Sequence, residues 1–235
     1  MFFFVSHSHS QTNYRYSVDL TKVEDDKLRI ELLCHKIESQ TILFYFPKIV
    51  PGTYINSNFG KYIHDFKATD IAGNVLPLKK LEDNTWEIMN SHLLYRINYL
   101  VEDTWDSEIT NTVYPMAGTN FEADKNFVIN TCGLFGYFQG FSKTTFEVSF
   151  IKPIDFYAAT GLKPFSTSAT KDVFTCASVV ELYDSPIMLS LPDTATLKVG
   201  NTEVLIAAYS PNKLVSSSFI ATHFEKLLRV TKNYL

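Results

Sequence analysis

The sequence has few cysteines, no basic cluster and no long apolar run. Its three cysteines, Cys34, Cys132 and Cys176, are widely spaced and odd in number, so they predict neither a disulfide framework nor a C-x-x-C metal knuckle. We expect them to be buried thiols. No apolar segment approaches the ~20 residues that a membrane-spanning helix needs. With 21 basic and 25 acidic residues, the net charge of −4 disfavours nucleic acid as a partner.

Motifs of catalysis are missing too. A zinc peptidase needs H-E-x-x-H on a helix, because two histidines one turn apart hold the metal and the glutamate polarises its water. The nearest approach, His223-Phe224-Glu225, lacks the adjacent glutamate and the second histidine. Neither a G-x-S-x-G elbow nor a glycine-rich phosphate loop occurs. The sequence therefore predicts no catalytic residue, no metal ligand and no cofactor in this chain.

Hydrophobic and aromatic residues are plentiful. They make up 46% and 14% of the 235 residues, whereas only 20% are charged. A chain of this length can form one large domain or two small ones with a real core. The aromatic content favours sheets over long exposed helices.

Period-two alternation predicts strands along most of the chain. Residues 14–20 and 28–34 alternate around an acidic turn and indicate a hairpin, and residues 41–46 are apolar throughout, as in a strand buried on both faces. Other short strands are expected at 62–69, 85–88, 93–101, 146–151, 156–160, 173–177, 179–182, 187–189, 196–199 and 203–209. Pro51-Gly52, residues 72–74 and Gly200-Asn201 are turn signals. This spacing predicts a mainly β fold, an antiparallel β-sandwich of two packed sheets over residues 14–215.

One long loop interrupts this pattern. Residues 102–125 carry no clear periodicity and are punctuated by Asp103, Asp106, Gly118 and Asp124. Loops without internal structure rarely exceed ~12–15 residues in compact domains. We therefore expect this loop to be functional or to cover another domain.

The C-terminal segment changes character. The serines at 216–218 can cap a helix, and Ile220, Phe224, Leu227 and Leu228 recur at near-helical spacing. Residues 216–235 are therefore predicted to form an amphipathic helix. Its apolar stripe needs more to pack on than the sandwich alone.

The N-terminal segment, residues 1–13, is expected to be a disordered terminus or the remnant of a signal peptide. Met1-Phe2-Phe3-Phe4-Val5 is apolar and Ser8-His9-Ser10 is similar to a cleavage site, although the basic region of a signal peptide is missing. A signal remnant predicts a periplasmic or secreted protein, with a cytoplasmic one as the alternative.

Short motifs follow one another in a specific order. They are Pro47-x-x-x-Pro51-Gly52-Thr53-Tyr54, Lys61-Tyr62-Ile63, Asp70-x-x-Gly73-Asn74, and the segments at 117–120, 126–130, 134–137, 159–162 and 182–187. From Tyr14 onward this order resembles the N-terminal domain of the glycyl aminopeptidase family of zinc metallopeptidases, metallopeptidase family sixty-one, whose members often contain a PDZ domain.

The resemblance implies a domain that precedes a thermolysin-like zinc catalytic domain, in an enzyme that removes N-terminal glycine or alanine from peptides. The sequence stops where that catalytic domain would begin, so we predict no peptidase activity from this chain alone. Zinc would belong to the missing domain, which would be the chain's partner together with a peptide substrate. Candidate substrate-binding residues are Tyr54, Asn130 and Tyr137, because a hydroxyl or amide can hydrogen-bond a peptide end.

A stand-alone carbohydrate-binding or adhesion module is the alternative function. Exposed aromatic patches mark ligand surfaces, whereas aromatics at alternate strand positions are usually core residues. The aromatic residues that could line a sugar-binding face are Tyr45, Tyr54, Tyr62, Trp86, Tyr95, Tyr99, Trp105, Tyr114 and Tyr137.

Overall fold

The computed structural model describes residues 13–50, 52–110 and 113–234. The expected signal remnant therefore lies outside the described residues, as do Pro51 of the Pro-Gly turn and Leu235 of the expected helix. Beside Pro51, Gly52 has a φ of +91°, and the amide of Thr53 donates to the carbonyl of Val50 at 3.2 Å. The chain thus turns where the sequence predicts it.

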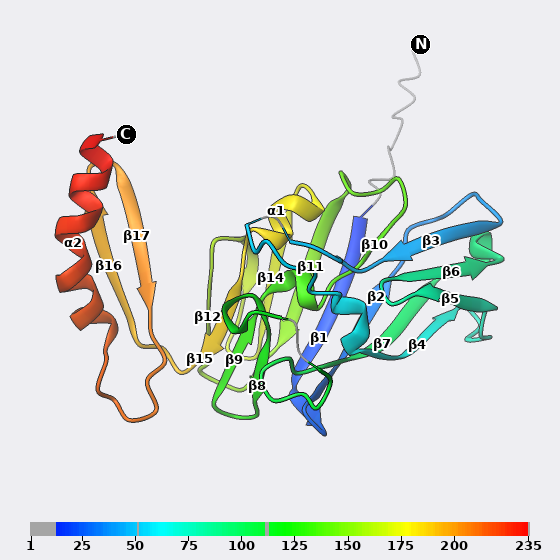
Figure 1. Ribbon diagram of the computed structural model, residues 1–235, viewed down its shortest axis with the longest axis horizontal. Coiled ribbons are helices and arrows are strands. Elements are labelled where there is room, and N and C mark those ends of the chain that lie inside the picture. The colour runs from blue at the N-terminus through cyan, green and yellow to red at the C-terminus, as the bar shows by residue number, and fades with distance from the viewer. Residues whose placement is uncertain (1–12, 51, 111–112, 235) are drawn as a thin grey trace, which may run out of the picture.

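A large sheet forms one layer of the body (Figure 1). It has seven strands, which are, in spatial order, β13 (Lys163–Thr167), β14 (Lys171–Cys176), β11 (Thr145–Ile151), β1 (Asn13–Glu24), β2 (Lys27–Leu33), β7 (Arg96–Glu102) and β4 (Ile63–Thr69). The alternation of buried and more exposed residues along β2 and β7 is the period that a sheet with one solvated face requires.

Two smaller sheets share one core with this large sheet. The first contains β10 (Tyr137–Phe138), β3 (Thr41–Tyr45), β6 (Thr85–Met89) and β5 (Leu78–Glu82). The second contains β12 (Tyr157–Thr160), β15 (Ile187–Ser190), β9 (Asn126–Ile129) and β8 (Asn120–Glu122). Short helices connect the strands: η1 (Phe59–Tyr62), η2 (Ser91–Leu93), η3 (Pro115–Ala117), η4 (Thr131–Gly133) and α1 (Val179–Tyr183).

The predicted β-sandwich is confirmed. One pair of strands is parallel, although the sequence predicts antiparallel sheets. β1 and β11 run parallel, with Asn13 opposite Thr145. A parallel pair needs a crossover rather than a tight turn, and here the crossover contains most of the sandwich. β1 therefore lies in the middle of the large sheet, between β11 and β2.

The strand predicted at residues 179–182 is wrong, because this segment forms the helix α1. Ser178 caps it, with its hydroxyl accepting from the amide of Glu181 at 3.2 Å. The Glu181 carboxylate accepts in return from the amide of Ala177 at 2.7 Å. This reciprocal capping stabilises a helical turn more than β-branched valines disfavour it.

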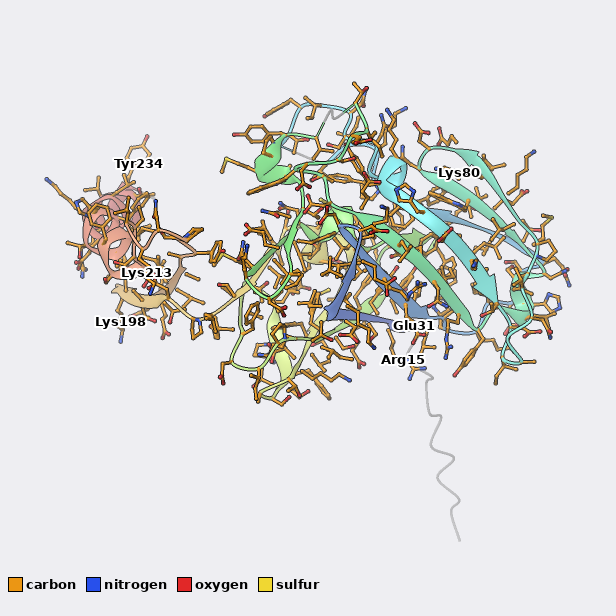
Figure 2. All side chains as sticks on the ribbon, turned by 90° about the horizontal axis from the view of Figure 1, so that it is seen from below. Arg15, Glu31, Lys80, Lys198, Lys213 and Tyr234 are labelled. Atoms are coloured by element: carbon orange, nitrogen blue, oxygen red, sulfur yellow. The ribbon has the colours of Figure 1, made fainter. Side chains whose placement is uncertain are left out.

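The last strands form a separate unit. β16 (Thr194–Val199) and β17 (Thr202–Ala207) pair with each other in their own sheet and pack on α2 (Ser217–Tyr234). We expected residues 14–215 to form one sandwich, whereas this hairpin pairs with none of the sandwich strands described. Figure 2 shows Lys198, Lys213 and Tyr234 on this unit, away from Arg15 and Glu31 on the large sheet.

The predicted C-terminal helix is present, with one face packed on the hairpin and apolar side chains on another. Ser217 and Ala221 are buried on the face toward the hairpin. A second set of apolar side chains lies on another face of the helix, since positions three or four residues apart point the same way. We call it the exposed stripe: Phe219, Leu227, Val230 and Tyr234, which are 53%, 57%, 59% and 90% exposed.

Candidate functional site

Three loops meet around a second small core. They are the described residues within 47–58 and 103–119, together with residues 130–136, and we call them the loop cluster. The small core consists of Phe59, Tyr62, Val113 and Cys132, with Val50, Ile109 and Tyr183 packed against it. Each loop contributes to this core, so the three loops are held together as one surface.

Asp103 closes the longest of these loops. Its carboxylate accepts from the amide of Trp105 at 2.7 Å and from the amide of Phe121 at 2.5 Å. Burial raises the pKa of Asp103 to about 6 despite these hydrogen bonds, and the nearby Asp106 and Asp26 raise it further. The expected long loop, residues 102–125, is thus tied to the sandwich through Asp103, and among its described residues it contains η3 and the short strand β8.

An acidic cavity of about 470 Å³ lies beside Asp103, between the turn after β1 and the loop after β7. Glu102 at its wall binds the His64 ring at 2.6 Å and the Ser107 hydroxyl at 2.5 Å. The other carboxylates in the wall are Asp25, Asp26, Asp103, Asp106 and Glu108. Its carboxylates outnumber the one lysine in the wall, Lys27, so the potential of the cavity favours cations. The described residues nevertheless hold no group of three or more His, Cys, Asp or Glu arranged to bind a metal.

Four core tyrosines hold the segment 134–138, which follows Asn130. Three of their hydroxyls donate to backbone carbonyls: Tyr99 to that of Leu134 at 2.6 Å, Tyr183 to that of Phe135 at 2.6 Å, and Tyr16 to that of Gly136 at 2.7 Å. The fourth hydroxyl, that of Tyr14, accepts from the backbone amide of Phe138 at 2.7 Å. We call this arrangement the tyrosine cradle. Burial raises the pKa of all four tyrosines above its usual value near 10, so the hydroxyls stay protonated at physiological pH.

Gly136 allows this segment to approach β3. A Cβ at this position would lie 2.3 Å from a ring carbon of Phe44 and 2.6 Å from the carbonyl oxygen of Tyr45. Only glycine fits without a shift of the backbone. The tyrosine cradle and this contact together fix the position of Tyr137, the next residue.

The three predicted substrate-binding residues lie in three different environments. Tyr54 is 95% exposed at a φ of +57°, so its side chain extends from the loop cluster into solvent. The Asn130 amide donates to the carbonyls of Gly118 at 2.6 Å and Met116 at 3.1 Å, so it braces the neighbouring loop. Tyr137 is half-buried, and its ring lies 5.7 Å from that of Tyr45. Tyr54 and Asn130 share the loop cluster, whereas Tyr137 begins β10.

None of the three cysteines has the environment of a nucleophile. Cys132 and Cys176 are buried as predicted, and Cys34 is half-buried; all three are free thiols. Burial raises the pKa of Cys132 and of Cys176 to about 12, and it raises that of Cys34 as well. Since the thiolate is the reactive form, these thiols are inert at neutral pH.

The aromatic residues considered for a sugar-binding face do not form one surface. Tyr62, Trp86 and Tyr99 are at most 3% exposed and belong to the core. Trp105 is 48% exposed, but its indole N–H donates to the carbonyl of Pro115 at 2.8 Å and stabilises the loop.

A family model described as the Peptidase M61 N-terminal domain matches residues 15–191. The chain belongs to this family. The M61 N-terminal domain thus covers the three sheets of the sandwich, and β16, β17 and α2 lie beyond it. The expectation from the motif order is confirmed. No curated protein matches the chain.

The fold of this M61 N-terminal domain is found in a solved structure. An aminopeptidase N family protein from Idiomarina loihiensis is 17% identical with a TM-score of 0.79, over 92% of this chain and 35% of that one. A zinc metallopeptidase of family M1 from Deinococcus radiodurans, with a Tyr-Ser-Ala substrate bound, is 13% identical with a TM-score of 0.49, over 93% of this chain and 52% of that one. The chain thus spans about a third to a half of the length of these proteins.

None of the helices in the described part of the chain is both long enough and apolar enough to cross a membrane.

Proposed function

We propose that the sandwich of this chain is the non-catalytic N-terminal domain of a zinc aminopeptidase, and that residues 194–234 form the first part of the catalytic domain. The exposed stripe of α2 is the observation that carries this proposal. The unit of β16, β17 and α2 lies beyond the matched family domain, and a unit of roughly 40 residues is at the lower size limit for a domain that is stable alone. The exposed stripe therefore needs a further layer, which the rest of a catalytic domain would supply.

In this proposal the sandwich supports the catalytic domain, and the loop cluster closes one side of the peptide cleft. Zinc in the catalytic domain would activate the water that attacks the peptide. The described residues of this chain do not fit a zinc site, and we assign binding and positioning to them. Tyr54 is the strongest candidate for contact with substrate, because its side chain is free of packing.

The exposed stripe provides the test of this proposal. In the complete enzyme, Leu227→Asp combined with Val230→Asp is expected to lower the free energy of unfolding by about 3 kcal/mol or more, because each buried aliphatic side chain contributes ~1.5–3 kcal/mol. Peptidase activity should fall with it. The measurements are thermal unfolding and hydrolysis of an alanyl peptide.

Thr222→Asp, an exposed substitution on α2 that is not part of the exposed stripe, is the matched control and should change stability by less than about 0.5 kcal/mol. If the stripe variant behaves like this control, the stripe is solvent-exposed in the enzyme and the proposal is wrong.

Tyr54 gives a separate test of the loop cluster. Tyr54→Ala in the complete enzyme is expected to lower kcat/KM for glycyl and alanyl peptides about tenfold, the effect of one lost contact of ~1.4 kcal/mol, without changing the melting temperature. Phe165→Ala is the control, since Phe165 is an exposed aromatic on β13, at the opposite edge of the large sheet from β4. An unchanged kcat/KM for Tyr54→Ala would remove Tyr54 from the cleft.

A further inference from the structure

The described chain passes once from the sandwich to the unit of β16, β17 and α2, at Leu191-Pro192. We call this unit the C-terminal unit and these two residues the link. Both residues are exposed, and they follow β15 without joining any sheet of the described chain. Figure 1 shows the C-terminal unit set apart from the sandwich and joined to it at one end of the hairpin. Two exposed residues thus connect the two bodies.

The C-terminal unit is held together at Asp193, the residue after the link. Its carboxylate accepts from the amide and the hydroxyl of Ser217, the first residue of α2, at 3.2 and 2.6 Å. Its carbonyl accepts from the amide of Ala208, the residue after β17, at 2.9 Å. Ser217 and Ala208 are both buried. Because β16, β17 and α2 all meet at Asp193, they form one body, and bending is confined to the link before it.

The packing between this body and the sandwich is loose. α2 packs on β16 and β17, whereas no described element of the sandwich packs on any of these three to a similar extent. An open cavity of about 660 Å³ separates the turn between β8 and β9, at Asp124 and Lys125, from the loop after β17. Close-packed interiors contain few voids larger than a water molecule, so packing does not lock this junction.

One polar contact bridges the junction. Tyr209, in the wall of the cavity, interacts with the carboxylate of Glu122 on β8, and both residues are half-buried. Partial burial raises the pKa of the Tyr209 hydroxyl, and the charge of Glu122 and its hydrogen bond to the hydroxyl raise it further. The hydroxyl therefore stays protonated at physiological pH and donates to the carboxylate. A hydrogen bond to a charged acceptor is stronger than one between neutral groups.

The link limits how far the C-terminal unit can turn. Proline fixes its own φ at about −65° and disfavours the helical conformation for the residue before it. Leu191 and Pro192 therefore leave few backbone angles free, and rotation about these angles gives a restricted swing rather than free tumbling.

We propose that Leu191-Pro192 is a hinge between the sandwich and the C-terminal unit, and that the contact of Tyr209 with Glu122 latches the unit in the orientation that Figure 1 shows. The hinge and its latch do not depend on the proposed role of the chain in an aminopeptidase. One consequence does rest on that role: if α2 leads into a catalytic domain, the hinge sets the orientation of that domain relative to the loop cluster.

Double electron–electron resonance between two spin labels on the full chain tests the latch. Thr170→Cys, in the exposed turn after β13, and Thr222→Cys, on α2, carry the labels, since the three native thiols are inert at neutral pH. With the latch intact, one main distance is expected. Tyr209→Phe removes only the hydroxyl of the latch, so it should raise the fraction of molecules outside that distance about threefold to tenfold.

Pro192→Gly tests the link. Combined with Tyr209→Phe, it should broaden the distance distribution beyond that of Tyr209→Phe alone, because glycine frees the angles that proline fixes. Tyr234→Phe is the matched control, since it removes a hydroxyl from the same unit at the other end of α2, where Tyr234 is 90% exposed. This control should leave the distribution unchanged.

The proposal is overturned if Tyr209→Phe gives the same distance distribution as the wild type, because the unit would then be fixed without the latch. A wild-type distribution as broad as that of the combined variant would also overturn it, since the latch would hold nothing. If adding Pro192→Gly had no effect, the bending would lie outside the link and the hinge would be wrong. Circular dichroism of each variant confirms that the fold is kept. None of these results affects the proposed function, which the exposed stripe tests separately.

Discussion

Lys152→Met is expected to lower the free energy of unfolding by about 3–5 kcal/mol, because it leaves the Asp172 carboxylate buried without its counter-ion. Methionine has nearly the length of lysine, so the change removes the charge and keeps most of the packing. Both side chains are less than a tenth exposed, and solvent cannot compensate the lost charge. Urea denaturation of the wild type and the variant gives the difference directly.

The double variant Lys152→Met with Asp172→Leu is the informative control. Replacing both partners of a buried ion pair by apolar groups is often neutral or stabilising, so most of the lost stability should return. A loss below about 1 kcal/mol in the single variant would mean that water reaches Asp172 and that the pair behaves as a surface salt bridge.

Substitutions in the tyrosine cradle should lower the free energy of unfolding almost as much. Tyr16→Phe and Tyr99→Phe each remove a hydroxyl from a buried carbonyl, at a cost of about 1–3 kcal/mol for each unsatisfied group. The double variant should lose more unfolding free energy than either single variant. Its loss should differ from the sum of the two single losses, because the two side chains hold adjacent parts of one segment. Urea denaturation measures the stability, and hydrogen exchange of residues 134–138 measures the local opening.

Tyr54→Phe is the matched control for this series, since it removes the hydroxyl of a tyrosine that is 95% exposed. It should alter stability by less than about 0.5 kcal/mol. If the core variants were equally mild, the hydroxyls would contribute no more than water does, and segment 134–138 would be held by packing alone.

Much of the sandwich follows from alternation in the sequence. The expected strands at residues 14–20, 28–34 and 93–101 correspond to β1, β2 and β7, because a sheet with one buried face imposes a period of two. The same period occurs at residues 196–199 and 203–209, yet these strands pair outside the sandwich. Alternation shows that a segment has one buried face, but it does not show which sheet the segment joins.

The misassigned helix α1 had a readable signal. Ser178-Val179-Val180-Glu181 is a capping box, which places a serine and a glutamate three residues apart at a helix start. The two valines favour a strand, but the capping hydrogen bonds of Ser178 and Glu181 stabilise a helix instead.

The candidate site could be predicted only in part. The motif order gave the family, and it directed attention to Tyr54, Asn130 and Tyr137. The tyrosine cradle was not predictable from spacing, because Tyr16 and Gly136 are far apart in sequence and meet only once the layers pack. Its one local signal is Tyr14 and Tyr16 at alternate positions of one strand, which places both rings on the same face.

The central position of β1 affects how the chain assembles during synthesis. Among the strands of the large sheet, β1 is translated before the others, but its parallel neighbour β11 follows more than a hundred residues later, with Asn13 opposite Thr145. Until then the nascent hairpin of β1 and β2 has an open edge, which is prone to pairing with other chains. The large sheet can therefore be completed only after translation has passed Cys176, the end of β14. Pairings between strands so far apart in sequence are also slow to form.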